Sequence, residues 1–207
     1  MSVKLVDHMG TDLSVVNAAR VSFAKENKEF QVVDDSRLIR YLAKHNHWSP
    51  FGHASLQFHV TAPVFVARQL VKHQVGLVWN EVSRRYVDSE PEFHFVEEWR
   101  GSPDNKKQGS SDKVITIDYD IQKEYITECT NTYRYLLDKG VCPEQARMVL
   151  PQSMMTEWYW SGTLMAFARV CNLRCKEDAQ KETQDIANSI DSLCRTQFPV
   201  SWNALRS

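Results

Sequence analysis

The sequence lacks several features by which large classes of protein are recognised. It contains neither a glycine-rich dinucleotide-binding fingerprint nor a phosphate-binding loop of the Walker type. A dinucleotide site, if the chain has one, must therefore be built in another way. No run of residues approaches the roughly 18 apolar positions of a membrane span, and the first residues lack the apolar core of a signal peptide. We therefore expect a cytoplasmic protein without a membrane partner.

The chain also lacks an excess of charge of either sign. Lys and Arg total 25 against 26 Asp and Glu, which gives a formal net charge of -1 at pH 7. Dedicated nucleic-acid-binding proteins usually carry a basic excess, so we expect no nucleic-acid partner. Hydrophobic residues make up 43% of the 207 residues, which is enough to form a core, and we expect residues 1–207 to form a single domain.

The five cysteines form no recognisable disulfide framework, and none stands in a setting typical of a nucleophile. Cys171 and Cys175 are spaced so that one helix presents both, either to a metal ion or as two half-buried structural thiols. Because no histidine follows at ligand spacing, we favour structural thiols. His45, His47 and His53 also invite a metal hypothesis, but they lack a nearby acidic partner. We predict no metal site.

The hydrophobic pattern predicts an α+β fold. Alternation of Leu56, Phe58 and Val60 with polar residues indicates a half-buried strand, and a second strand is predicted over residues 154–160. Within that second strand, the aromatic run Trp158-Tyr159-Trp160 is interpreted as core rather than as a base-stacking platform. A surface loop is predicted over residues 101–111. Four helices are predicted from their first residues, which are Thr11 or Asp12, Asp34 or Asp35, Pro63 and Pro143. The helix that begins at Pro63 is expected to run through Val71 and to be buried nearly all round. Three more are predicted to include Tyr125–Leu136 before Gly140, and to cover Leu164–Asn172 and Asp178–Cys194.

The densest group of chemically active side chains lies between residues 68 and 86. If the helix continues that far, Arg68 and Lys72 share one face, and Gln69 and His73 another. Together with two arginines after the turn, these cations suit a phosphate pocket, because the guanidinium group grips phosphate oxygens in pairs. Without further evidence, a run of charged residues such as this one is more often a solvated surface with ordinary salt bridges.

Glu81 and Ser83 alternate along a stretch predicted to be extended, so both side chains are expected to face one ligand. Glu81 would accept a hydrogen bond from a sugar hydroxyl, and Ser83 would donate one to a phosphate or carbonyl oxygen.

Several ordered motifs resemble the flavin-dependent thymidylate synthases. That family carries Arg-His-Arg, seven residues and then Ser, usually ending in Asn-Glu-x-Ser-x-Arg-Tyr, and this chain has Asn80-Glu81-Val82-Ser83-Arg84-Arg85-Tyr86. Further family-like segments follow in the family's order over nearly the whole chain: Ala18–Phe23, Lys44–His47, Ala62–Gln69, Ala146–Pro151, Asn172–Arg174, Ala179–Gln180 and Phe198–Pro199.

The chain departs from the family's signature at its first part. Lys72-His73-Gln74 stands in place of Arg-His-Arg, and the eight residues 75–82 precede Ser83. At other family positions near the flavin this chain also carries a different residue. These residues of this chain are Gly52, Thr163, Met165, Arg169 and Asp178. We interpret these changes as a variant with a remodelled flavin pocket, in which Arg169 restores a charge near the pyrophosphate.

The resemblance implies an α+β domain with a mostly antiparallel sheet flanked by helices, assembled into a homotetramer with active sites between subunits. It implies reductive methylation of dUMP to dTMP, in which methylenetetrahydrofolate supplies the carbon and FAD reduced by NADPH supplies the hydride. The dUMP-binding residues it implies are Gln69, Lys72, Glu81, Ser83, Arg84, Arg85, Arg147 and Arg174. The residues it places near FAD are Ser22, Ser49, His73, Gln74, Thr163 and Arg169.

Catalytic roles are implied for Arg174 and His47. A fixed guanidinium beside uracil stabilises negative charge after ionisation at N3, which makes C5 more nucleophilic without an enzyme thiolate. Ser83 is interpreted as a substrate-binding residue, because no base is assigned to it. The apolar neighbours Leu150 and Leu173 predict partial burial of Arg147 and Arg174.

Two alternatives use the same binding residues. An enzyme on this scaffold would stop at a hydroxymethyl product or act on another pyrimidine nucleotide. A binding protein without catalysis would hold dUMP but carry no flavin.

Overall fold

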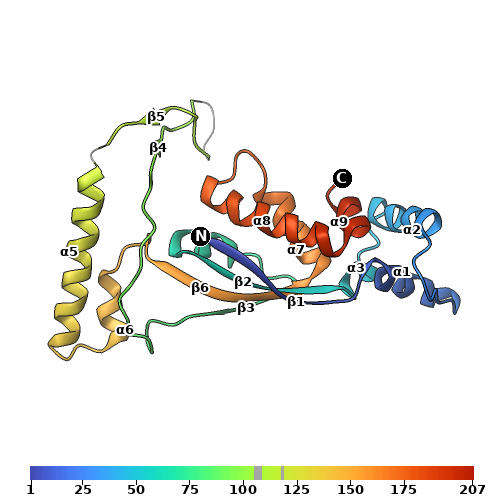
Figure 1. Ribbon diagram of the computed structural model, residues 1–207, viewed down its shortest axis with the longest axis horizontal. Coiled ribbons are helices and arrows are strands. Elements are labelled where there is room, and N and C mark those ends of the chain that lie inside the picture. The colour runs from blue at the N-terminus through green and yellow to red at the C-terminus, as the bar shows by residue number, and fades with distance from the viewer. Residues whose placement is uncertain (105–108, 118) are drawn as a thin grey trace.

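The computed structural model describes residues 1–104, 109–117 and 119–207 (Figure 1). Four antiparallel strands form the main sheet in the order β1-β2-β6-β3. Their bounds are Ser2–Met9 for β1, Ser55–Pro63 for β2, Leu77–Glu81 for β3 and Met155–Thr163 for β6. The predicted α+β class and antiparallel sheet are confirmed. The edge strand β1 was not predicted, and the strand β3 ends at Glu81, so Ser83 lies two residues beyond the strand.

Alternating burial along the central strands places the core on one face of the sheet. On β2, Leu56, Phe58 and Val60 are buried while the residues between them are partly exposed. On β6, Trp158 and Trp160 are buried, which confirms that they are core residues. Tyr159 between them is 48% exposed and faces the other side of the sheet, so its assignment to the core is wrong. Figure 1 shows α7, α8 and α9 along this same face.

The helices follow the hydrophobic pattern with shifts at their ends. They are α1 Asp12–Arg20, α2 Val32–Lys44, α3 Ser49–Gly52, α4 Val64–Leu70, α5 Tyr119–Asp138, α6 Pro143–Ala146, α7 Leu164–Arg174, α8 Lys181–Gln197 and α9 Pro199–Leu205, with 3-10 turns η1 Val21–Phe23 and η2 Arg147–Val149. None of these helices combines the length and apolar character needed to cross a membrane.

Three expectations about the helices need correction. Pro63 is the residue before α4 rather than its first residue, and α4 ends before Val71. Lys72 and His73 therefore lie beyond the helix, and they do not continue the faces that carry Arg68 and Gln69. The helix α4 is also buried on one side only, because Arg68 is exposed. The helix α8 begins at Lys181 rather than at Asp178.

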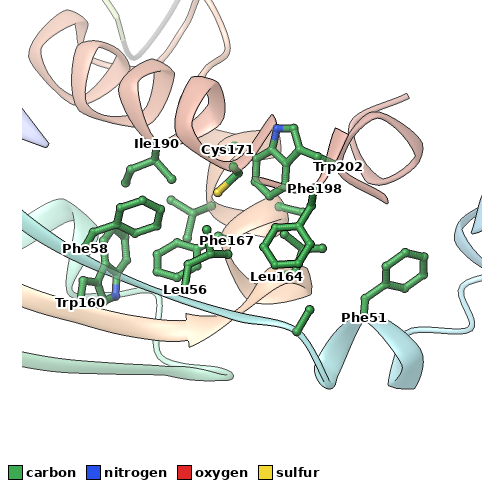
Figure 2. Packing of buried hydrophobic residues seen from close by; sticks show 14 of the residues in the cluster. Phe51, Leu56, Phe58, Trp160, Leu164, Phe167, Cys171, Ile190, Phe198 and Trp202 are labelled. Carbon is green, nitrogen blue, oxygen red and sulfur yellow. The ribbon is translucent and has the colours of Figure 1, made fainter. Parts of the chain in front are cut away.

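Aromatic side chains join the sheet to the helices above it. Figure 2 shows Phe58 of β2 and Trp160 of β6 directed toward Phe167 of α7, with ring centroids 4.9 and 5.3 Å away. Burial of large rings contributes most of the stabilisation in such a core. The layer fixes the C-terminal end of α7, where Arg174 lies.

The short strands β4 (Trp99–Arg100) and β5 (Val114–Ile115) pair with each other and bracket the predicted surface loop. Within that loop Gly101 donates a backbone hydrogen bond to Lys113 at 2.7 Å. The loop positions 105–108, including Lys106 and Lys107, lie outside the described residues. Figure 1 shows α5 at one end of the molecule and α1 and α2 at the other.

Candidate functional site

A cavity of about 610 Å³ opens at the end of β3 and the start of β6, beside α4 and η2. It brings the carboxylate of Glu81 together with arginines from three separate segments. The polar residues that line it include Arg68, Glu81, Arg84, Glu90, Arg147, Gln152 and Thr156. Glu92 and Glu157 also line it, so the cavity combines cations with carboxylates, and this chemistry suits a phosphorylated sugar.

Glu81 is exposed to solvent, yet both of its carboxylate oxygens accept hydrogen bonds. Trp79 donates through Nε1 to Oε2 at 3.1 Å, and Thr156 donates through Oγ1 to Oε1 at 2.8 Å. These two partners were missed from the sequence. The spacing of Trp79, two residues before Glu81 on a strand, is the signal that could have identified it.

The arginines in and near the cavity, of which Arg84 and Arg147 line it and Arg85 does not, differ in how they are held. Arg84 donates to the carbonyl oxygens of Ser89 and Glu90, which anchors the loop after β3. Arg147 lies on η2, is exposed and donates through Nε to the carbonyl of Glu144 at 3.3 Å, so the expectation of its partial burial is wrong. Arg85 is exposed and lies over the Tyr86 ring, to whose hydroxyl it also donates.

A second cluster surrounds Arg174 at the end of α7. Its guanidinium donates through Nε to Nε2 of His73 at 3.0 Å and through Nη2 to the carbonyl oxygen of Gln69 at 3.4 Å. Gln69 in turn donates through Nε2 to the side chain of Gln180. Arg174 is partly buried, as expected.

The environment of His73 sets its protonation. Burial lowers the pKa of His73 below its ordinary value, and the positive charge of Arg174 lowers it further. A guanidinium can only donate, so Nε2 of His73 must be the unprotonated ring nitrogen. His73 is therefore a neutral ring whose second nitrogen carries the proton.

The sequence-predicted dUMP residues thus fall into two groups within one chain. Glu81, Arg84 and Arg147 line the cavity, whereas Gln69 and Arg174 are not among its lining residues. Ser83 is partly buried beside the cavity segment, where its Oγ accepts from the Arg85 backbone at 3.4 Å. Lys72 is exposed on the turn after α4.

The residues assigned to the flavin lie mostly on exposed surface. Ser22 on η1, Ser49 at the start of α3, Gln74 and Arg169 are exposed. Thr163 instead serves the fold, because its Oγ1 accepts from the Ala166 backbone at 3.2 Å and caps α7.

The turn that carries Gln74 is held tightly against β6. Gly76 has φ +76° and accepts a hydrogen bond through its carbonyl oxygen from the backbone of Thr163 at 3.1 Å. Gly162 permits this approach, because a Cβ there would lie 2.5 Å from the Gly76 oxygen. The extra residue in this segment is thus accommodated in a turn between α4 and β3.

His47 is exposed after α2, where its ring lies 6.0 Å from that of Tyr41. Within the described residues, one group has ligand atoms close enough for a metal, formed by Cys171, Cys175 and Asp191. The Asp191 carboxylate already accepts from Trp202, Arg195 and Arg206, so guanidinium groups neutralise it. Cys171 is buried and Cys175 is partly buried, as structural thiols would be.

Comparison with known proteins places these residues in context. A family model described as "Thymidylate synthase complementing protein" (Thy1) matches residues 4–200. A flavin-dependent thymidylate synthase from Thermus thermophilus is 39% identical over 203 residues, covering 98% of this chain and 74% of the relative. Another from Kosmotoga olearia is 37% identical over 211 residues, covering 98% and 88%.

A solved structure is similar to this chain in its fold. The UMP/dUMP methylase PolB from Streptomyces cacaoi, bound with 5-Br dUMP, matches with a TM-score of 0.85 and 30% sequence identity. The match covers 98% of this chain and 93% of the methylase chain.

Proposed function

We propose, because the chain belongs to the thymidylate synthase complementing protein family, that it is a flavin-dependent thymidylate synthase that methylates dUMP to dTMP. The observation that carries this proposal is the cavity in which Glu81 faces the cations Arg84 and Arg147. The relatives named for this reaction and the methylase structure with a dUMP analogue favour it over a hydroxymethylase or a binding protein. UMP is the second substrate to test, because the methylase neighbour is named for both nucleotides.

Charge gives the nucleotide a direction in the cavity. A phosphate is repelled by the Glu81 carboxylate and attracted by Arg84, Arg85 and Arg147, so the phosphate lies at the arginines and the sugar at Glu81. Ser83 donates to a phosphate oxygen, and Gln69 and Lys72 complete the contacts to dUMP.

Arg174 is the residue that activates the uracil ring. Its Nε is fixed by His73 and its Nη2 by the Gln69 carbonyl, so its guanidinium is preorganised rather than free to rotate. A guanidinium held in this way stabilises the anion formed when N3 loses its proton, and the electron density at C5 rises. His47 completes the catalytic residues.

The flavin side of the site is formed by exposed hydroxyl, amide and guanidinium groups, which suit a phosphorylated cofactor. Ser22, Ser49, His73, Gln74 and Arg169 would hold FAD, with Thr163 at its border, where β6 ends and α7 begins. FAD when bound supplies hydride chemistry after reduction by NADPH, and methylenetetrahydrofolate supplies the one-carbon unit. The neutral His73 ring offers one N–H donor and no charge to this surface.

Arg174 does not line the Glu81 cavity, which supports a site shared between subunits of a homotetramer. Apolar and aromatic side chains of η1, α2 and the residue before α3 are exposed, which is unfavourable in an isolated chain. They include Val21, Phe23, Val32, Val33, Tyr41 and Trp48.

Mixing variants tests the shared site. Glu81→Ala and Arg174→Ala should each be inactive alone, because each lacks one group of dUMP contacts. After dissociation and reassociation together, a fraction of the sites should carry both intact residues and recover dTMP formation. If the mixture forms dTMP no faster than the separate variants, that result would contradict a site built from two subunits. Sedimentation velocity on the same samples reports whether a tetramer forms.

A further inference from the structure

The Glu81 carboxylate is held by residues outside the motif that contains it. On β3, side chains two residues apart share a face, so Trp79 and Glu81 point the same way. On the neighbouring strand β6, Thr156, Trp158 and Trp160 share the buried face. The register pairs Trp79 with Trp160 and Glu81 with Trp158, which sets Glu81 directly beside this row.

Trp79 is immobilised by aromatic packing. Its ring stacks on that of Trp158, with centroids 4.3 Å apart and planes 19° from parallel. It also meets Trp160 edge to face at 5.5 Å. Because both partner rings are buried, the Nε1–H of Trp79 has a fixed direction, and it points at Oε2 of Glu81 over 3.1 Å.

Thr156 fixes the other oxygen. It is 5% exposed and lies near the start of β6, and its hydroxyl donates to Oε1 of Glu81 at 2.8 Å. An exposed glutamate otherwise exchanges among several rotamers, and ordering it on binding costs free energy. Two donors hold this carboxylate in one place before any ligand arrives.

The arrangement leaves acceptor capacity for a ligand. An ionised carboxylate offers about four lone-pair positions, of which the two donors use two. We propose that Trp79 and Thr156 are positioning residues that hold Glu81 as a preformed acceptor for a sugar hydroxyl of the nucleotide. This inference rests on the proposed function, because it names the group of dUMP that Glu81 binds.

The test uses full-length variants that each remove one donor. Thr156→Val replaces the hydroxyl by a methyl group, Thr156→Ser retains the hydroxyl, and Trp79→Phe keeps an aromatic ring but lacks Nε1. Thr130→Val is the matched control, because Thr130 is also a buried threonine that donates at 2.8 Å, but to a backbone carbonyl within α5. Titration calorimetry would give the Kd of each variant for dUMP and for 2′,3′-dideoxyuridine monophosphate, which lacks the 3′-hydroxyl.

Thr156→Val and Trp79→Phe should each weaken dUMP binding by roughly threefold to tenfold, which corresponds to one hydrogen bond. Thr156→Ser and Thr130→Val should bind dUMP like the unaltered protein. The loss should disappear with the dideoxy nucleotide, because that ligand has no hydroxyl to give to Glu81.

Two results would overturn the inference. One is unchanged dUMP binding in both Thr156→Val and Trp79→Phe. The other is an equal loss for dUMP and the dideoxy nucleotide, since that would show a general structural effect. A distinct result, no dUMP binding by the unaltered protein, would contradict the proposed function itself and with it the ligand assigned to Glu81.

Discussion

Arg174 and His73 are 101 residues apart in the chain, and a hydrogen bond of 3.0 Å joins Nε of one to Nε2 of the other. The contact links the end of α7 to the turn after α4, and so connects the residue assigned to uracil with one assigned to flavin. It also determines the charge of both partners, because the arginine keeps its proton and the histidine is neutral.

The first prediction concerns the titration of His73. Burial and then the charge of Arg174 lower its pKa, so in the folded protein it should protonate at a pH below the ordinary value of about 6.5. Arg174→Gln removes the charge and should move the pKa of His73 upward. NMR titration of the histidine ring protons, assigned with His73→Asn, measures both values. A pKa at or above the ordinary value in the unaltered protein would refute the assignment.

The same shift has a consequence for stability. Because the folded pKa is depressed, the unfolded chain binds more protons than the folded one as the pH falls below about 6.5. His73 therefore does not lower the free energy of unfolding above a pH of about 6.5. As the pH falls from there to the lower pKa of the folded state, the free energy of unfolding decreases. Denaturant unfolding of His73→Asn should show a weaker acid dependence in this window. An unchanged dependence would assign the acid sensitivity to other groups.

The second prediction concerns turnover. Arg174→Ala should reduce kcat for dTMP formation by about 100-fold or more, which is typical for loss of a preorganised charge at a developing anion. Arg174→Lys keeps a positive charge but not the planar group that contacts His73 and Gln69, so it should recover only part of the rate. Near-normal turnover in Arg174→Ala would eliminate the role proposed for it.

The third prediction addresses the altered signature. Gln74 is exposed on the turn, so an arginine can be placed there without entering the core. If this position faces the FAD phosphates, Gln74→Arg should bind flavin as tightly as the unaltered protein or more tightly. Flavin fluorescence quenching measures the Kd. A clear loss of flavin would show that the pocket has been rebuilt around the glutamine.

The fourth prediction tests how the turn is held. Gly162→Ala adds a Cβ at 2.5 Å from both the Gly76 oxygen and a Leu77 methyl group, so the turn must shift. The cost should be about 1–3 kcal/mol of unfolding free energy, as for an overpacked site. The neighbouring Ser161→Ala removes only one hydroxyl, which accepts from Gln57 at 2.9 Å, and should cost about 1 kcal/mol or less. Equal denaturation midpoints for the two variants would argue against the close contact.

The sequence predicted the parts of the fold that follow a simple period. The alternation in β2 and the apolar face of α7 are local patterns, and both elements formed where expected. The edge strand β1 was missed because its sequence shows only weak alternation. The end of α4 was misplaced because Val71 and Lys72 are acceptable in a helix, and the turn at Gly76 depends on contacts with β6.

In the candidate site, too, the local motifs were predictable from the sequence and the contacts between distant residues were not. The motif around Glu81 was recognisable from its order of residues, but its partner Thr156 is 75 residues away. No local pattern predicts that pairing, which follows from the β3–β6 register. The hydrogen bond between Arg174 and His73 could not be predicted from a local sequence pattern either, and neither could the exposure of Arg147.

The mass of the nucleotide product decides whether this protein methylates dUMP. The protein would be incubated with FAD, NADPH, methylenetetrahydrofolate and dUMP under low oxygen, and the nucleotides analysed by mass spectrometry. The account predicts a product heavier than dUMP by one methyl group in place of hydrogen, formed only when the reductant and the folate are both present. Unchanged dUMP with a protein that carries no flavin, or a hydroxymethyl product, would contradict it.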